Sequence, residues 1–195
     1  MFDIVFPSRN EKDFIEMAVR LGFSGIVFVY KDKKDFFAGD APIHIMNALL
    51  VDANKILKAR SAKVLAFCET TDARSALENG ADVVFGVEAS EFEDKTHYRI
   101  SGLNQVLCKI AAENKSSIGF SFEKVLSCFG PRRAKLLGRM MQNIALCRKF
   151  KVPMRIGSFA KDPFGMRSPT DLAAFFQQLG MTSSEAHLAL SAFKL

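Results

Sequence analysis

Apolar positions along the chain follow two alternating spacings, and this alternation predicts strands followed by helices. Residues 25–30 form a near-continuous apolar run rich in β-branched side chains, which is typical of a strand covered on both faces. In residues 11–21 the apolar positions, Phe14 and Ala18 among them, recur instead at helical spacing. Gly22 follows, where glycine commonly ends a helix. The chain therefore begins as a series of strands and amphipathic helices.

The same alternation continues to the end of the sequence, with no linker or low-complexity stretch to divide it. About seven strands are predicted, at residues 3–6, 25–30, 43–51, 64–68, 83–87, 116–120 and 153–157. Helices are predicted at residues 11–21, 54–59, 72–79, 103–114, 134–151, 169–179 and 182–193. We expect one domain over residues 1–195.

A repeating series of this kind forms parallel strands joined by right-handed crossovers. Two α/β architectures compete, an open doubly wound sheet and a closed or nearly closed barrel. The regular series, without a glycine-rich GxGxxG turn, favours the barrel. Because a typical barrel of this type has about 250 residues, we expect a trimmed TIM-like (β/α) barrel of about seven parallel strands with surrounding helices, some of them short or missing.

The composition is that of an ordinary globular protein, with 49% hydrophobic and 25% charged residues. It excludes disordered, collagen-like and coiled-coil proteins. No apolar run approaches the roughly 20 residues that span a bilayer, and the N-terminus lacks the pattern of a secretory signal. The four cysteines, Cys68, Cys108, Cys128 and Cys147, form no CxxC pair, which predicts unpaired thiols and argues against a zinc ribbon. We expect a soluble cytoplasmic protein without membrane association.

Positive charge is concentrated in one part of the chain. The sequence has 27 Lys and Arg against 21 Asp and Glu, a formal net charge of +6. No acid lies between Glu123 and Asp162, and ten bases do: Lys124, Arg132, Arg133, Lys135, Arg139, Arg148, Lys149, Lys151, Arg155 and Lys161. The rest therefore carries 17 bases against 21 acids. Such a block is typical of a surface that binds a polyanion; a solvated helix face that happens to lack acids is the alternative.

If residues 131–150 form a helix, basic residues of the block lie in a row on one of its faces. A rotation of about 100° per residue places Arg132, Lys135, Arg139, Gln142 and Asn143 along one face. Leu136, Leu137, Met140, Ile144 and Cys147 fall on the opposite or adjacent face and are expected in the core. The basic side chains would then reach phosphates in a row, and the two amides would add hydrogen bonds to sugars or base edges.

Two helix starts place an arginine beside a capping residue. Ser101 follows Arg99 by two positions and is a predicted N-cap, and Ser168 follows Arg167 directly, with Pro169 in the first helical position. Capping alone explains both arrangements. The functional alternative is an arginine held beside exposed helix N–H groups, a geometry that binds phosphate.

Local motifs for catalysis are missing. The three histidines, His44, His97 and His187, share no motif, and neither GxSxG nor a Walker-type GxxxxGK[ST] is present. Four acids, Asp3, Glu69, Asp82 and Glu88, lie in or at the ends of predicted strands, where catalytic residues of barrels are found. They leave an acid-based site open, although the case for catalysis by this chain is weak.

Three stretches of the sequence resemble a known family. They are SGLNQVLCKIAAENKSSIGFSF from Ser101, RMMQNIALCRKFKVPMRI from Arg139 and MRSPTDLAAFFQQLGM from Met166. With the opening FDIVFP, they make the chain resemble, over nearly its entire length, the TIM-barrel-like protein subunit of archaeal and eukaryotic ribonuclease P. The pairing of QNIALCRKFKVP with RSPTDLAAFFQQLGM is specific.

The resemblance implies a subunit of the endoribonuclease that removes 5′ leaders from precursor tRNA, in which RNA and Mg²⁺ perform the chemistry. This chain would bind and stabilise the ribonuclease P RNA, pair with another small protein subunit, and itself hold no catalytic residue, metal or cofactor. From the resemblance and the basic block together, the residues expected at RNA are Arg99, Ser101, Asn104, Arg132, Arg133, Lys135, Arg139, Asn143, Arg148, Lys149, Arg155, Arg167 and Ser168. Gly102 and Asp171 also match the family's pattern.

Two other functions remain open from the sequence. One is a metal-dependent barrel phosphoesterase whose basic face receives a small phosphorylated substrate, an idea that rests on fold analogy alone. The other is a sensor of a small phosphate ester, which would bind that ester without regard to RNA.

Overall fold

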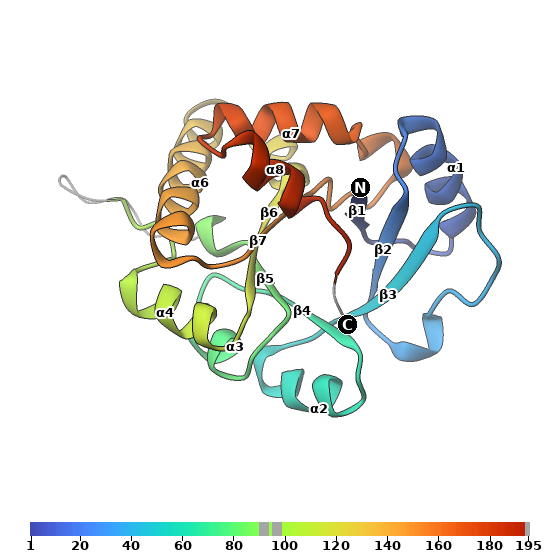
Figure 1. The fold of residues 1–195 in the computed structure, drawn as a ribbon, viewed down its shortest axis with the longest axis horizontal. Coiled ribbons are helices and arrows are strands. Elements are labelled where there is room, and N and C mark those ends of the chain that lie inside the picture. The colour runs from blue at the N-terminus through green and yellow to red at the C-terminus, as the bar shows by residue number, and fades with distance from the viewer. Residues whose placement is uncertain (90–93, 95–98, 194–195) are drawn as a thin grey trace.

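Seven parallel strands follow one another around a barrel in the order of the sequence (Figure 1). The computed structural model describes residues 1–89, 94 and 99–193. The strands are β1 (Phe2–Val5), β2 (Gly25–Tyr30), β3 (His44–Leu50), β4 (Leu65–Glu69), β5 (Val83–Phe85), β6 (Ser117–Ser121) and β7 (Met154–Gly157). The expectation of a trimmed TIM-like barrel with about seven parallel strands is confirmed.

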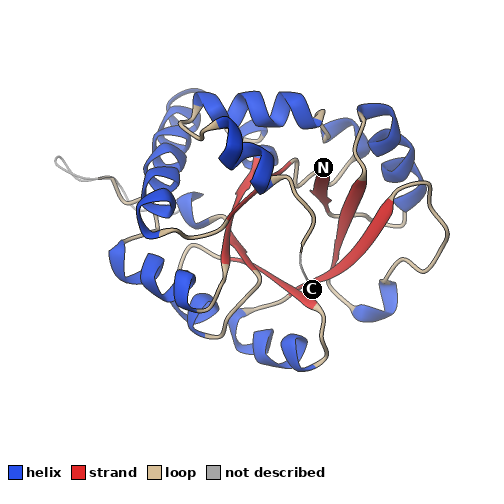
Figure 2. Ribbon diagram, in the orientation of Figure 1, coloured by secondary structure: helices blue, strands red, loops and turns tan. Residues whose placement is uncertain are grey.

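Helices surround the ring of strands on its outside, as Figure 2 shows. They are α1 (Glu11–Leu21), α2 (Ile56–Ser61), α3 (Arg74–Glu78), α4 (Gln105–Glu113), α5 (Phe122–Leu126), α6 (Gly130–Phe150), α7 (Pro169–Gln178) and α8 (Ser183–Ala189). Within the described residues, four short 3₁₀ helices interrupt the connections: η1 (Lys33–Asp35), η2 (Ala53–Lys55), η3 (Val87–Ala89) and η4 (Pro163–Gly165). The short α2, α3 and α5 account for the small size of the barrel.

The barrel closes between its first and last strands through the residues that follow β7. The Phe159 N–H donates to the Ile4 carbonyl at 2.8 Å, and the Phe6 N–H donates to the Ala160 carbonyl at 2.8 Å. Val5 and Ala160 form a parallel bridge between these bonds. The ring is therefore nearly closed, which removes the two edges that an open seven-stranded sheet would expose.

Two apolar layers hold the fold together. The inner layer fills the barrel with Ile4, Val27, Val29, Ala48, Leu65, Phe67, Val83, Phe85 and Phe159. The outer layer lies between strands and helices and takes the alternate strand positions, such as Ile26 and Phe28 of β2, together with the buried faces of the helices. Because both faces of each strand are covered, β2 is buried at all six positions, as its continuous apolar run predicts.

The largest departures from the predicted elements lie where the backbone turns sharply. β5 ends at Phe85 because Gly86 adopts a left-handed conformation (φ 80°), so the apolar run 83–87 is a strand only in its first half. The last helix ends at Ala189 rather than Phe193, and the Phe193 ring packs on Phe67 at 5.7 Å between centroids. The short α5 was not predicted.

Two expectations from composition concern the thiols and the membrane. All four cysteines are unpaired, as predicted. Burial raises the pKa of Cys68 and of Cys108 to about 11. Across the described part of the chain, no helix combines the length and the hydropathy that crossing a bilayer requires.

Candidate nucleic-acid interface

The basic block is organised by α6, a helix of 21 residues that is about 30 Å long. Pro131 stands in its first turn, and Lys151 ends it in a left-handed conformation (φ 56°). The predicted core face is confirmed for Leu136, Met140, Ile144 and Cys147, which are all buried. α6 therefore packs along the barrel and presents its basic residues at its two ends.

Arg139, in the middle of α6, does not lie on an exposed stripe, and that prediction is wrong. Its side chain is only 2% exposed, and its Nη2 and Nε donate to the Asp94 carboxylate at 2.8 and 3.0 Å. Its Nη1 donates to the Glu88 carbonyl at 3.1 Å. Asp94 stands 45 positions earlier in the chain, so no local pattern could have revealed this pairing. Arg139 ties α6 to the segment after β5.

Asn143 is likewise buried, and the prediction of an exposed amide at this position is wrong. Its Nδ2 donates to the Ser101 carbonyl at 2.8 Å, which joins α6 to the chain just before α4. Ser101 is itself buried and does not cap α4; Asn104 does, accepting from the Leu107 N–H at 3.0 Å. Asn143 and Ser101 hold the fold, because their polar groups face the interior rather than solvent.

Gly102 explains why the chain beside Ser101 is fixed. It adopts a left-handed conformation (φ 84°), and a Cβ atom at this position would lie 2.1 Å from the Val87 carbonyl oxygen. No other residue type fits such a close approach. The motif that opens with Ser101 therefore has a structural role at its first two positions, between η3 and α6.

Basic side chains gather around the start of α6, and Arg132 is the exposed one among them. We call Lys124, Arg132, Arg133 and Lys135 the N-terminal basic cluster. Arg132 is exposed, and the described residues offer it no ion pair or hydrogen bond. Arg133 is half-buried, donates to the Cys128 carbonyl at 2.6 Å and lies 5.0 Å from the ring of Phe129, which is 72% exposed. A cation beside an exposed aromatic ring suits stacking and phosphate contact with single-stranded nucleic acid.

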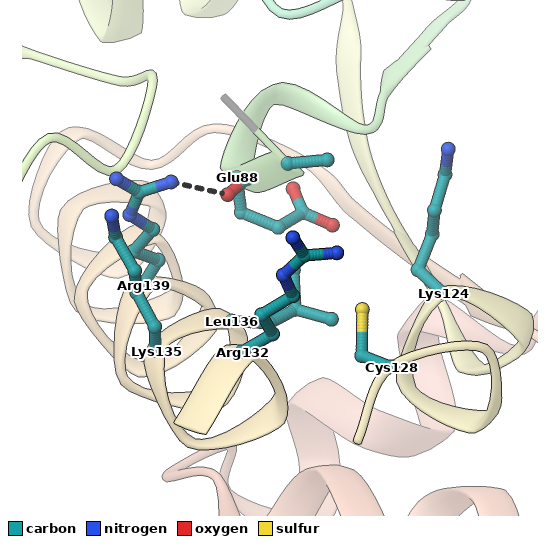
Figure 3. A pocket seen from close by; sticks show the side chains of 8 residues that line it. Glu88, Lys124, Cys128, Arg132, Lys135, Leu136 and Arg139 are labelled. Atoms are coloured by element: carbon teal, nitrogen blue, oxygen red, sulfur yellow. Dashed lines mark hydrogen bonds between the residues drawn. The ribbon is translucent and has the colours of Figure 1, made fainter. Parts of the chain in front are cut away.

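A pocket of about 480 Å³ lies against this cluster (Figure 3). Its described lining residues are Glu88, Ala89, Lys124, Cys128, Arg132, Lys135, Leu136 and Arg139. Glu88 is fully buried, and neither of its carboxylate oxygens has a hydrogen-bond partner among the described residues. Burial raises the pKa of Glu88 to about 7. Lys124, which forms an ion pair with Glu69, and Phe129 were missed as site residues, although the acid-free block contains both.

The C-terminal end of α6 is basic as well, but one of its basic side chains is already engaged within the fold. Arg148 is bound to the Glu185 carboxylate at 2.6 and 2.8 Å and to the Gly180 carbonyl, so it is committed to holding α8. Lys149 and Lys151 are exposed. The prediction that Arg148 contacts RNA therefore competes with a structural role that the sequence did not suggest.

Two further predicted arginines are engaged locally, and a third lies near the N-terminal basic cluster. Arg155 is half-buried; it donates to the Ser191 carbonyl at 2.7 Å and lies 4.0 Å from the Phe193 ring. Arg167 donates to the Met166 carbonyl at 2.7 Å. Arg99 is exposed and lies against Gly138 of α6, close to the cluster. Since Arg139, Arg148 and Arg155 are each engaged within the fold, the ten bases of the acid-free block do not form one continuous surface.

The second predicted helix start is confirmed. Ser168 caps α7 by accepting from the Asp171 N–H at 3.1 Å, and Pro169 occupies the first turn. The Ser168 hydroxyl also donates to the Asp171 carboxylate at 2.8 Å. Because Asp171 places a negative charge at this end of the helix, the geometry favours capping over the binding of a phosphate here.

Aromatic side chains occupy the mouth of the barrel, at the carboxyl ends of the strands. Phe85 packs on Phe159 at 4.9 Å between ring centroids, and Phe6 lies within 6.2 Å of both. The backbone of Phe159 is left-handed (φ 51°), a conformation that is costly for a residue other than glycine. Enzymes with this fold place their catalytic groups at this end. Here the rings line a pocket of about 740 Å³ together with charged side chains that include Lys31, Glu69, Glu123 and Lys161.

The four acids considered as catalytic candidates serve different parts of the structure. Asp3 is buried and accepts from the Ser158 N–H at 2.6 Å and the Ile4 N–H at 2.8 Å, while Asp82 accepts from the Ala66 N–H at 2.7 Å. No group of three or more potential metal ligands occurs among the residues that the structure describes. His97 lies outside those residues.

Comparison with known proteins decides the family. The profile of the family described as RNase P subunit p30 matches residues 94–193, just over half of the chain. The chain belongs to this family. The match includes all of α6 and both helices that follow it, so the N-terminal basic cluster lies within the matched region, whereas Glu88 at the inner wall of the pocket lies just before it.

Relatives of the chain include proteins named ribonuclease P protein component 3. That of Methanosarcina mazei is 37% identical over 118 residues, which cover 60% of this chain and 46% of the relative. That of Methanococcoides burtonii is 41% identical over 91 residues, covering 47% of this chain and 38% of the relative. The aligned part thus spans less than half of the length of either relative.

Solved structures share the fold of this p30-family chain at low identity. A chain from the cryo-EM structure of archaeal ribonuclease P with mature tRNA superposes with a TM-score of 0.76 and 22% identity, covering 97% of this chain and 86% of that one. The histidinol phosphate phosphatase of Lactococcus lactis reaches a TM-score of 0.59 at 9% identity, covering 93% and 94%. Both similarities concern the barrel architecture.

Proposed function

We propose that this chain is an RNA-binding protein subunit of ribonuclease P, which supports the catalytic RNA and performs no chemistry itself. The observation that carries the proposal is the family match, which spans the helix that presents Arg132, Arg133 and Lys135. Relatives named ribonuclease P protein component 3 support it. The RNA would be bound chiefly through its backbone and shape, because basic side chains pair with phosphates regardless of sequence.

The partners follow from the same proposal. The chain would contact the ribonuclease P RNA through the N-terminal basic cluster and Phe129, and would pair with another small protein subunit of the complex. Precursor tRNA is then the substrate of the assembled enzyme, and Mg²⁺ acts with the RNA.

Reconstitution tests the proposal. An archaeal ribonuclease P RNA and the remaining protein subunits are assembled with and without this chain, and cleavage of a 5′-extended precursor tRNA is measured at limiting Mg²⁺. We expect the chain to raise cleavage, and the double variant Arg132→Glu/Arg133→Glu to remove most of that increase. Lys33→Glu/Lys34→Glu, which changes two exposed lysines of η1 and the same amount of charge, serves as the control.

Two results would contradict the proposal. One is cleavage that does not depend on the chain at any Mg²⁺ concentration. The other is turnover of a phosphate ester by the purified chain with a stoichiometric bound metal, which would identify the barrel phosphoesterase instead. A phosphate sensor would bind one ester tightly and leave cleavage of precursor tRNA unchanged.

A further inference from the structure

The pocket beside α6 contains a buried acid that the fold itself does not use. Glu88 lies on η3, directly after the turn at Gly86, and its side chain is fully buried. Both carboxylate oxygens lack a hydrogen-bond partner among the described residues, although its backbone carbonyl is bound by Arg139. A buried polar group without a partner is costly and rare in native proteins. Glu88 is therefore a group that a ligand would satisfy.

The surroundings of Glu88 define what kind of ligand fits. Figure 3 shows its carboxylate pointing toward the side of the pocket where Arg132 and Lys124 lie. Because Glu88 is fully buried and Arg132 is exposed, the acid marks the inner end of the pocket and the arginine its outer end. A suitable ligand has hydrogen-bond donors at one end and negative charge at the other.

Simpler ligands fail one of these two conditions. An arginine or lysine of a protein partner, or a metal cation, would meet Glu88 but would also face Arg132 and Lys135 of the wall, besides Lys124 and Arg139, which are paired with Glu69 and Asp94. A phosphate alone would suit Arg132 but would be repelled by the Glu88 carboxylate. A nucleotide meets both conditions, since its base is neutral and its phosphate is charged. The volume of about 480 Å³ lies in the ordinary range for a ligand pocket.

The two carboxylate oxygens of Glu88, which lack a partner among the described residues, determine which nucleotide base fits the pocket. An ionised carboxylate only accepts hydrogen bonds, and it does so through two oxygens side by side. Guanine is the standard base whose Watson–Crick edge presents two adjacent donors, N1–H and the N2 amino group. We propose that this pocket binds an unpaired guanine nucleotide, with Glu88 accepting from the base and Arg132 contacting the phosphate. The inference rests on the proposed function, since ribonuclease P RNA would be the source of the nucleotide.

Binding of free mononucleotides to the purified chain tests the pocket, followed by NMR titration. We expect guanosine 5′-monophosphate to bind at least about tenfold more tightly than inosine 5′-monophosphate, which lacks only the N2 amino donor. Glu88→Gln should abolish that preference, because its amide offers one acceptor and one donor. Glu113→Gln, at an exposed position of α4, should retain it. Equal affinities for the two nucleotides in the wild-type chain would overturn the proposal.

The preference should also depend on pH. Ionised Glu88 accepts from guanine, so the affinity for guanosine 5′-monophosphate divided by that for inosine 5′-monophosphate should rise between about pH 6 and pH 8. Titration of the phosphate does not affect this ratio, because both nucleotides carry the same phosphate. The other groups facing Glu88 are Lys124, Cys128, Arg132, Lys135 and Arg139, with Glu69 behind Lys124. A ratio that falls with rising pH would mean that a protonated Glu88 donates instead, and would contradict the assignment.

Two further experiments show which part of the proposal is wrong if the first one gives an unexpected result. Arg132→Ala should weaken both nucleotides equally and leave their ratio unchanged, which tests the outer end even if Glu88→Gln fails to fold. Binding of a single-stranded hexa-adenylate with one internal guanosine or inosine tests whether RNA is the source of the nucleotide. If the free nucleotides show the guanosine preference and the oligonucleotides do not, the ligand of the pocket is a small metabolite. If cleavage by the reconstituted enzyme depends on this chain but the chain does not prefer guanosine, the inference about the pocket is wrong and the proposed function is still supported.

Discussion

At the scale of the residue, Asp3 shows how burial makes the stability of this barrel depend on pH. Asp3 is the second residue of β1, is fully buried, and accepts hydrogen bonds from Ser158 across the barrel closure. Burial raises the pKa of Asp3 to about 6 from an ordinary value of 3.8, although these hydrogen bonds oppose the effect. The folded protein therefore holds this proton more tightly than the unfolded chain does.

The sign of the resulting pH dependence follows from proton linkage. A raised pKa in the folded state gives stability that is complete below the unfolded value and is lost as pH rises through about 6. We predict that Asp3→Asn gains stability relative to the wild type between about pH 4 and pH 7, by up to about 3 kcal/mol. Urea unfolding at both pH values measures this, with the exposed Asp13→Asn as control. A difference that does not change with pH would contradict it.

Arg132 and Arg139 form a matched pair of arginines on one helix. Arg139 is buried against Asp94, whereas Arg132 is exposed. We predict that Arg139→Ala lowers the free energy of unfolding by about 3–5 kcal/mol, because it removes a buried side chain together with its ion pair to Asp94 and its hydrogen bond to the Glu88 carbonyl. Arg132→Ala should change it by no more than about 0.5 kcal/mol. Thermal and denaturant unfolding measure both, and equal effects would show that Arg139 has no special structural role.

At the scale of the element, α6 separates its positive charge into two ends. The N-terminal basic cluster faces a pocket and an exposed aromatic ring, while at the other end Arg148 is held by Glu185. The middle of the helix is structural, through Arg139 and Asn143. A helix of about 30 Å thus carries two candidate contact regions rather than one stripe.

The two ends of α6 are expected to contribute differently to RNA binding. We predict that Arg132→Glu/Arg133→Glu flattens the dependence of log affinity on log salt by about 0.7–0.9 for each phosphate that the variant no longer neutralises. Lys149→Glu/Lys151→Glu, which makes the same change in charge at exposed positions, should flatten it less. Filter binding of ribonuclease P RNA over a series of salt concentrations compares the two. A larger effect at the C-terminal end would move the interface there.

At the scale of the whole molecule, the interior of the barrel is a packed core. Phe159 lies at the closure and is 1% exposed, and its N–H completes the ring of strands by donating to Ile4. Phe164, a little further along the chain, is 83% exposed. The same residue type therefore serves the core at one position and the surface at the other.

These two phenylalanines give a direct test of the packing around Phe159. We predict that Phe159→Ala costs about 3–5 kcal/mol of stability, because it opens a cavity among packed rings. Phe164→Ala should cost less than about 0.5 kcal/mol. Denaturant midpoints of the two variants measure the difference. A small cost at Phe159 would mean that the rings around it are loosely packed.

Much of the fold was predictable because its signals are local. The apolar run of β2, the helical period of α1 and the cap at Ser168 were each predicted correctly, since each depends on neighbours within a few residues. The candidate site was predictable only in part. The acid-free block located α6 and its exposed start, but helical periodicity placed Arg139 and Asn143 on the wrong side.

The sequence by itself determined the order of strands and helices, the parallel barrel and the segment that carries the positive charge, because periodicity and composition act over short distances. Tertiary structure alone decided which charges remain available. Asp94 lies 45 positions from Arg139 and Glu185 lies 37 positions from Arg148, and only the folded chain brings each pair together. The same holds for Glu88, whose burial against α6 results from packing that no stretch of sequence contains. Pairing and desolvation are properties of the assembled core, and they decide which groups face a ligand.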